Sequence, residues 1–192
     1  MQPVTFLEAL QYAHSKKVVL PDEFYSMDLK TRQMATTVSF LSSLEQAESV
    51  IKSLNKTLAS GGTFNDFQKL VAESKIILPK HYLDNVFRTN IQSAYGHGRW
   101  QQQQRNKDKR QYLMYSAIND SRVRPAHLAL NRIVLPIDHP FWLTHYPPLS
   151  FSCRCTVIAL TEKQALKYGI TPDDKLPEVA EALDWSSHPL QF

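Results

Sequence analysis

Two cysteines separated by one residue, Cys153 and Cys155, are the first candidates for chemistry in this 192-residue sequence. In an extended strand, residues two apart point to the same face, so both sulfurs could face one ion. Thiolate and imidazole donors suit Zn²⁺, which binds four ligands in a tetrahedral site. The sequence therefore makes zinc the candidate cofactor, and the candidate metal ligands are His127, Asp138, His139, Cys153 and Cys155.

The same cysteines also have simpler interpretations. Free cysteine packs as a small hydrophobic side chain, in which case the histidines are surface or core hydrogen-bonding groups. A redox role is less favoured, because the two-residue spacing of thioredoxin-type motifs is absent. Two cysteines are also too few for a disulfide scaffold. Metal binding and simple burial both stay open at this point.

A second polar group follows one face of an expected helix. Side chains spaced by three or four residues lie next to one another on a helix. The members of this face are Arg88, Gln92, Tyr95 and Arg99. The face could bind phosphate, or it could form a polar network with charged residues further along the chain, and we favour the network. The charged residues in question are Asp120, Arg122 and Arg124.

A basic run follows this helix, between Trp100 and Tyr112. Its cations are Arg105, Lys107, Lys109 and Arg110. Cations with aromatic neighbours are typical of surfaces that contact nucleic acid, which makes these four residues candidates for contact with double-stranded DNA. The alternative, a solvated charged surface, is the commoner outcome for a charge run.

Motifs of the common enzyme classes are absent. The sequence has no glycine-rich phosphate loop, no Gly-x-Ser-x-Gly elbow, no His-Glu-x-x-His pair and no EF-hand loop. We therefore assign no catalytic residue and do not expect an enzyme. The alternative function is a metal-dependent hydrolase or transferase acting on nucleic acid or protein. Its cleft would be lined by Arg88, Tyr95, Asp120, His127 and Asp138.

Apolar residues at helical spacing predict several helices in the first half of the chain. The expected helices cover about 3–17, 38–58, the segment after Thr63, and 81–100. Gly61 and Gly62 should end the second helix, because glycine readily takes the left-handed conformation found at helix ends. Thr63 is a suitable cap for the next helix, with Asp66 in its first turn.

The second half of the chain favours strands and loops. Stretches rich in β-branched or aromatic residues predict strands at about 112–118, 133–137 and 153–160. A proline-rich loop separates the last two, and Thr161 with Gln164 forms a capping-box pattern that starts a short helix. The expected fold class is α+β. Its parts are a helical region over 1–110, a small loop-rich α+β domain over 111–169, and a short tail over 170–192.

Composition limits the class of protein. Hydrophobic residues make up 43% of the chain and charged residues 21%, which is typical of a globular protein. No apolar run reaches the roughly 18–20 residues that cross a bilayer, and the first residues lack a signal-peptide pattern, so we expect a cytoplasmic origin and no membrane span. The net charge of +4 is compatible with a polyanionic partner.

The motifs together resemble the phage Mu F-like head morphogenesis family, the minor head proteins of tailed phages. The matching stretches are Phe87–Tyr95 with Gly98 and Arg99, Asp120–His127 with Leu130, Asp138–Trp142, Tyr146–Pro148 and Cys153–Cys155. Their order and spacing make the match specific over about 83–160. The chain departs from the family pattern at His139, where a second acidic residue is common, and at Ser150–Ser152, where a Gly-Trp-Gly type is expected.

This resemblance implies a function in virus assembly. Members are minor capsid components, present in few copies inside the head and linked to the portal and to DNA packaging or ejection. The resemblance therefore implies a virion protein of the capsid interior, assembled in the host cytoplasm. The implied partners are portal or capsid proteins, with double-stranded DNA as a further candidate.

Overall fold

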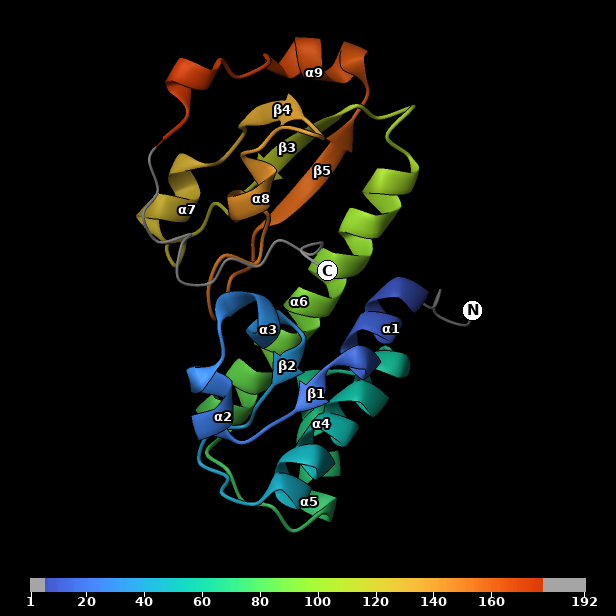
Figure 1. Ribbon diagram of the computed structural model, residues 1–192, viewed down its shortest axis with the longest axis vertical. Helices are drawn as coiled ribbons and strands as arrows, with labels where there is room; N and C mark the ends of the chain where they lie inside the picture. Colours follow the sequence, from blue (N-terminus) through green and yellow to red (C-terminus); the bar gives the residue numbers. More distant parts are fainter. Residues whose placement is uncertain (1–5, 178–192) are drawn as a thin grey trace. The chain divides into compact units, whose positions relative to one another are not determined.

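The computed structural model describes residues 6–177 and confirms the expected α+β class. The chain divides into two compact units. We call the described residues up to Gly98 the N-terminal unit and those from Arg99 onward the C-terminal unit (Figure 1). The domain boundaries 1–110, 111–169 and 170–192 stay a prediction, and most of the predicted tail lies outside the described residues.

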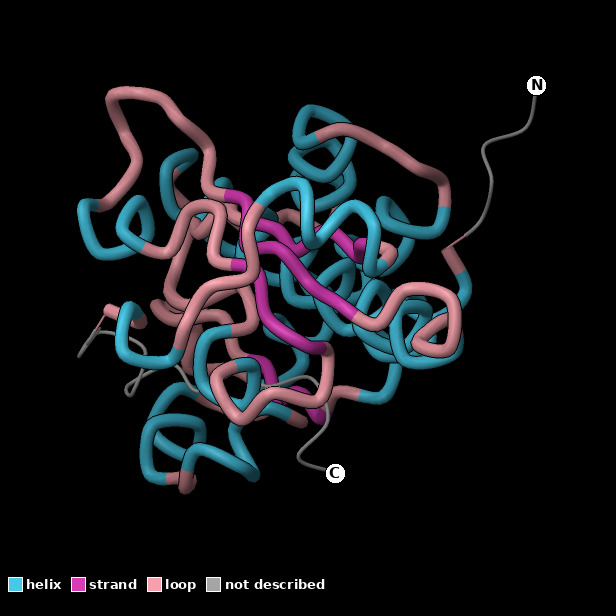
Figure 2. Tube along the Cα trace, turned by 90° about the horizontal axis from the view of Figure 1, so that it is seen from above, coloured by secondary structure: helices cyan, strands magenta, loops and turns pink. Residues whose placement is uncertain are grey.

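The N-terminal unit is mainly helical, with one short parallel strand pair. Its elements are α1 (Leu7–Ser15), β1 (Lys17–Val18), α2 (Pro21–Ser26), α3 (Leu29–Gln33), β2 (Ala35–Thr36), α4 (Leu44–Ala59), α5 (Phe64–Glu73) and the larger part of α6 (Lys80–Arg105). Lys17 pairs with Ala35, so the two strands tie the start of this unit together. In Figure 2 helices and loops account for most of the chain.

The core of the N-terminal unit is apolar and closely packed. Val50 of α4 and Phe67 of α5 are fully buried, and Val71 is 1% exposed. The rings of Phe67 and Phe87 stack with their centroids 5.6 Å apart, which joins α5 to α6. The apolar stripes seen in the sequence therefore form the interior of this unit, as predicted.

Two helix boundaries in this unit differ in how well the sequence predicted them. The Thr63 cap is confirmed, because its backbone amide donates to the Asp66 carboxylate at 2.8 Å in a full capping box. The expected start of the preceding helix at residue 38 is wrong. Phe40 has a positive φ of 65°, which a helix cannot contain, and α4 begins only after its cap Ser43.

Helix α6 runs from Lys80 to Arg105, past the expected end at Trp100. Gly98 on this helix faces α1 at close range. A Cβ atom at that position would lie 2.7 Å from the Phe6 ring and 2.9 Å from the backbone nitrogen of Ala9. Only glycine allows the two helices to approach this closely.

The C-terminal unit contains a small antiparallel sheet in the order β4-β3-β5. Its elements after α6 are β3 (Tyr112–Ser116), α7 (Pro125–Ala129), β4 (Val134–Pro136), α8 (Trp142–His145), β5 (Thr156–Leu160), α9 (Glu162–Tyr168) and the 3-10 helix η1 (Asp173–Lys175). The Thr161 capping box that starts α9 is confirmed. Figure 1 shows β3 between the other two strands.

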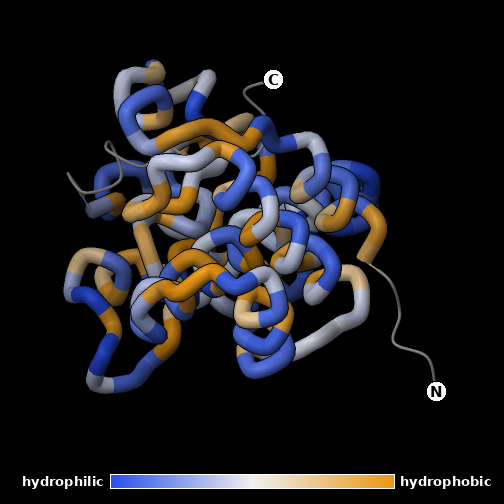
Figure 3. The backbone as a smooth tube through the Cα atoms, turned by 90° about the horizontal axis from the view of Figure 1, so that it is seen from below, coloured by the Kyte–Doolittle hydropathy of each residue, from blue (hydrophilic) through white to orange (hydrophobic). Residues whose placement is uncertain are grey.

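Both faces of the central strand β3 are buried. Leu113 and Tyr115 point into a large cluster with Trp142 and Tyr146, whereas Met114 points the other way and packs with Ala165 of α9. Because both faces of β3 are covered, its residues form a continuous apolar run instead of alternating between apolar and polar. Figure 3 shows short hydrophobic segments alternating with hydrophilic ones along the backbone.

Side chains block the free edge of β5. Gln103 donates to the carbonyl of Val157 at 3.0 Å, and Arg110 donates to that of Ala159 at 2.9 Å. These bonds satisfy carbonyl groups that would otherwise invite another strand. Among the described helices, none has the length and apolar character needed to cross a bilayer.

Candidate metal centre

The short helix α7 places His127 in the interior of the C-terminal unit. Pro125 occupies the first turn of this helix, where its fixed φ and missing N–H are tolerated. The preceding turn is closed by Asp120, whose carboxylate accepts the backbone N–H of Arg122 at 3.0 Å. His127 is 3% exposed as a result, although histidine is seldom so deeply buried.

The two cysteines precede β5 instead of lying within it, so the predicted strand start at residue 153 is wrong. β5 begins at Thr156. Cys153 ends a turn in which its N–H donates to the carbonyl of Ser150 at 3.1 Å. Ser152 within this turn has a φ of 55°, in the left-handed region that favours glycine. The turn, not the alternation of a strand, orients the sulfurs.

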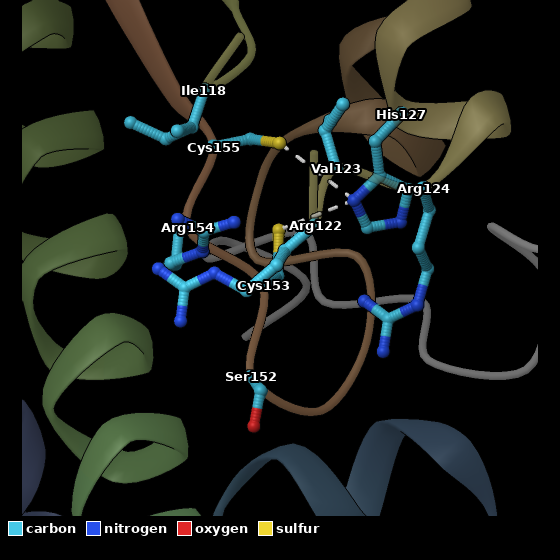
Figure 4. Close-up of a pocket in the computed structure, with 9 residues that line it drawn as sticks. All are labelled: Ile118, Arg122, Val123, Arg124, His127, Ser152, Cys153, Arg154 and Cys155. Carbon is cyan, nitrogen blue, oxygen red and sulfur yellow. Dashed lines mark hydrogen bonds between the residues drawn. The ribbon is translucent and has the colours of Figure 1, made fainter. Parts of the chain in front are cut away.

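The imidazole and the two thiols meet in one buried group. Nδ1 of His127 lies 3.7 Å from each sulfur, and the three possible ligand atoms lie within 4.8 Å of one another. Ligands bound to one tetrahedral Zn²⁺ at typical bond lengths have a sulfur-to-nitrogen distance of about 3.6 Å. The group is therefore able to hold a metal ion, and Figure 4 shows both sulfurs turned toward the ring.

The other ring nitrogen of His127 has its own partner. Nε2 lies 3.5 Å from the hydroxyl of Ser150, and that hydroxyl accepts a hydrogen bond from Arg124 at 2.9 Å. Arg124 also donates to the carbonyl of Phe151 at 3.0 Å. With its proton on Nε2, the imidazole presents the lone pair of Nδ1 to the sulfurs, as metal-binding histidines commonly do.

The two thiols have unequal acidity. Hydrogen bonding from Cys155, assisted by backbone groups and the charge of Arg124, lowers the pKa of Cys153 to about 6. The Cys153 sulfur, together with burial, raises the pKa of Cys155 to about 12. The pair thus shares one proton, so that one thiolate is available near neutral pH. Tyr115 borders the pair, and burial raises the pKa of its phenol far above the usual range.

Asp120 and Arg154 form an ion pair next to this group. Arg154 donates two hydrogen bonds to the Asp120 carboxylate, at 2.6 and 2.8 Å. The Arg154 guanidinium holds the pKa of Asp120 well below its ordinary value. Arg122 lies further from the same carboxylate, at 3.6 Å. The main partner of Asp120 is therefore Arg154.

The other two candidate ligands have different partners. Asp138 forms an exposed ion pair with Lys107 at 3.9 Å. The Nδ1 atom of His139 accepts the backbone N–H of Phe141 at 3.1 Å, and its Nε2 atom lies 3.3 Å from Asp173. Within the described residues, the metal-capable group contains neither of them.

The predicted polar face of α6 is divided between the two units. Arg88 pairs with Asp84 one turn earlier at 2.7 Å, and Tyr95 stacks on Phe6 with ring centroids 5.7 Å apart. Gln92 is half-buried in the same unit. Arg99 belongs to the C-terminal unit, as do Asp120, Arg122 and Arg124. A phosphate-binding role for this face stays a prediction.

The basic run is exposed but not uniform. Lys107 pairs with Asp138, and Arg110 is engaged with the edge of β5. Arg105 ends α6, and Lys109 lies in the turn that follows; both are exposed. Contact of these four residues with DNA stays a prediction.

Comparison with known proteins identifies the family. The model of the family described as "Phage Mu protein F like protein" matches residues 48–158, more than half of the chain. This chain belongs to that family. The match runs from within α4 to within β5 and includes all three members of the metal-capable group. The resemblance noted in the sequence is confirmed.

Two relatives extend the match beyond the family model. The Mu-like prophage FluMu F protein of Haemophilus influenzae is 32% identical over 178 residues, which cover 92% of this chain and 43% of that protein. The putative capsid assembly protein F of Escherichia phage Mu is 26% identical over 185 residues, covering 85% of this chain and 42% of that protein. The chain thus spans less than half the length of either relative. No solved structure gives a significant match.

Three residues of the site were not singled out as functional from the sequence. Ser150 orients the imidazole, Tyr115 borders the thiols, and Arg154 binds Asp120. Ser150 lies three residues before Cys153 and Arg154 lies between the two cysteines, so their position was a usable signal. Tyr115 comes from β3 and only the tertiary fold brings it to the site.

Proposed function

We propose that this chain is a phage minor head protein, an internal component of the virion that assembles with portal and capsid proteins. The match to the Phage Mu protein F like family over residues 48–158 carries this proposal. It is supported by the similarity to the capsid assembly protein F of phage Mu. The helical region over 1–110 is proposed as the part that docks on portal or capsid proteins.

Particle composition tests the proposal directly. DNA-filled heads and empty proheads are purified from a producing lysate, and this chain is quantified by mass spectrometry against the major capsid protein. We expect a few to a few tens of copies in both kinds of particle. Absence from particles, with the chain abundant in the cytosol, would contradict a role in the head. Cross-linking of the same particles then identifies whether the neighbour is portal or capsid protein.

We further propose that His127, Cys153 and Cys155 hold a zinc ion that stabilises the C-terminal unit. Their donor types and their spacing around Nδ1 support this assignment. Bound metal would fix the loop before β5 to α7, two segments 26 residues apart at Cys153 and His127. Metal binding that depends on folding contributes to stability, because the unfolded chain lacks the assembled site.

Zinc content and melting temperature test this site. Purified wild-type protein should contain one zinc per chain, and Cys153→Ser combined with Cys155→Ser should remove it and lower the melting temperature. Ser152→Ala is the matched control, since it changes the same loop without removing a ligand. If the wild type contains no zinc and melts at the same temperature as the double cysteine variant, the zinc proposal is wrong.

We propose contact with double-stranded DNA through the four basic residues Arg105, Lys107, Lys109 and Arg110. Each phosphate that a protein neutralises contributes about −0.9 to the slope of log affinity against log salt. Replacing Arg105, Lys107 and Lys109 by Gln should therefore reduce the salt dependence measurably. Arg110 is kept in this variant because it also caps the carbonyl of Ala159. Replacement of Lys163, Lys167 and Lys175 by Gln removes equal charge elsewhere in the C-terminal unit and should leave the slope unchanged.

The alternative function, a metal-dependent hydrolase or transferase, is not favoured by the comparisons. The relative from phage Mu is named as a capsid assembly protein, which supports a role in assembly instead. Turnover of DNA, RNA or protein substrates by the pure protein with added divalent metals would revive it.

A further inference from the structure

The metal-capable group has one donor fewer than a closed zinc site. Within residues 6–177, it consists of His127, Cys153 and Cys155, and no carboxylate or second imidazole joins it. Structural zinc sites are normally closed by four protein ligands, whereas sites with three protein ligands keep a position for an exchangeable one. A fourth ligand of the proposed zinc must therefore come from outside this group.

A small pocket opens onto the same three residues (Figure 4). Its walls also contain three arginines, namely Arg122, Arg124 and Arg154, and no acidic residue. Arg122 and Arg124 lie just before α7, the helix that carries His127, and Arg154 lies between the two cysteines. The approach to the open position is therefore cationic.

The charges around this pocket do not balance. Asp120 binds Arg154 through two hydrogen bonds and lies 3.6 Å from Arg122. Arg124 donates to neutral oxygens, those of the Ser150 hydroxyl and the Phe151 carbonyl. One carboxylate is thus shared by two of the three guanidinium groups, and the third, that of Arg124, binds neutral oxygens. Zn²⁺ with two thiolates and a neutral imidazole would add no net charge, so the excess of positive charge would persist.

We propose that the zinc keeps an open fourth position, and that this position takes an oxygen anion of the carboxylate or phosphate class, which Arg122 and Arg124 help to hold. Oxygen anions coordinate zinc, and they accept paired hydrogen bonds from guanidinium groups. The buried ligands admit only a small group, so the anion is either a side-chain carboxylate of another protein or a free phosphate. This inference rests on the zinc site proposed above.

Cobalt-substituted full-length protein provides the test. The visible absorption of Co²⁺ reports the number and type of its ligands. Acetate and inorganic phosphate are titrated separately at constant ionic strength, and we expect a saturable spectral change with at least one of them. Arg122→Gln should weaken that binding by about tenfold, the lower range for one charge-assisted hydrogen bond. The Arg122 side chain is 79% exposed, so its replacement should not disturb folding. Lys163→Gln removes the same charge from α9 and should bind as the wild type does.

Each outcome decides the inference. Saturation by acetate identifies a carboxylate ligand, saturation by phosphate identifies a phosphate ligand, and either result supports an open position. Stoichiometric cobalt with a spectrum that neither anion changes would overturn it while leaving the metal site intact. The titrations are repeated after a further histidine of the sequence, His188, is replaced by alanine. A response that appears only in this variant would also overturn the inference, because a fourth protein ligand would then close the site. Failure of the protein to bind cobalt or zinc at all would refute the metal proposal itself, and with it this inference.

Discussion

The two units of this chain are organised by different interactions. The N-terminal unit joins its helices through apolar contacts, such as the stacked rings of Phe67 and Phe87. The C-terminal unit also has an apolar core, but its candidate metal centre is positioned by polar bonds from loops, such as the Arg124 bonds to Ser150 and Phe151. Apolar contacts therefore stabilise the N-terminal unit, whereas polar contacts position the candidate metal centre. A change in one kind should leave the other largely intact.

The largest effect is expected from emptying the N-terminal core. Phe67 is fully buried, and Phe67→Ala should lower the free energy of unfolding by about 3–5 kcal/mol because it leaves a cavity. Urea unfolding followed by far-UV circular dichroism reports the helices. All three tryptophans lie at position 100 or beyond, so their fluorescence reports the rest of the chain separately.

Ile77→Ala is the control for that change, since Ile77 is 95% exposed and should contribute little. If Phe67→Ala shifts the tryptophan transition as much as the helical one, the two units unfold together. The contrast between them would then be one of local structure and not of independent stability.

A smaller loss is expected where two helices of the N-terminal unit approach most closely. Helix propensity alone predicts that Gly98→Ala raises the free energy of unfolding by about 1 kcal/mol. A new Cβ would instead meet the Ala9 backbone at 2.9 Å, and such overpacking costs about 1–3 kcal/mol. We expect a net destabilisation in urea unfolding. A stabilised Gly98→Ala protein would show that α1 does not need this close approach.

A gain in stability is expected in the loop of the C-terminal unit. Ser152 has a φ of 55°, a conformation that costs a non-glycine residue roughly 1–2 kcal/mol. Glycine removes that cost but loses more entropy on folding, so Ser152→Gly should stabilise by up to about 1 kcal/mol. Urea unfolding followed by tryptophan fluorescence measures this change in the free energy of unfolding. Ser152→Ala also removes the hydroxyl but keeps the Cβ, and a gain of equal size in that variant would contradict the explanation.

The features that follow from local patterns could be predicted from the sequence. The apolar stripes of α4 and α5 and the caps at Thr63 and Thr161 are confirmed, because helical periodicity and capping involve residues close in sequence. The start of α4 was misjudged because Phe40 matches the apolar period, although its backbone has turned out of the helix.

The candidate site could be predicted only in part. Grouping His127 with Cys153 and Cys155 agrees with the structure, but the expected strand geometry does not, since a turn brings the sulfurs together. The preference of Asp120 for Arg154 depends on how two distant loops meet. Sequence spacing carries little information on such contacts, because they are set by the tertiary fold.

The smallest effect is expected from the Asp120–Arg154 ion pair, because both side chains remain partly exposed to water, at 34% and 26%. The pair lowers the pKa of Asp120 in the folded protein, so its contribution is fully present above the unfolded pKa of about 4. It is lost as the pH falls below that value toward the folded pKa. Unfolding free energies of the wild type, measured with a metal chelator present, should therefore decline more steeply between about pH 4 and 2 than those of Asp120→Asn, which has no carboxylate to protonate. Equal slopes would mean that water screens this pair almost completely, and that hydrogen bonds to neutral groups, such as those of Arg124, position the site.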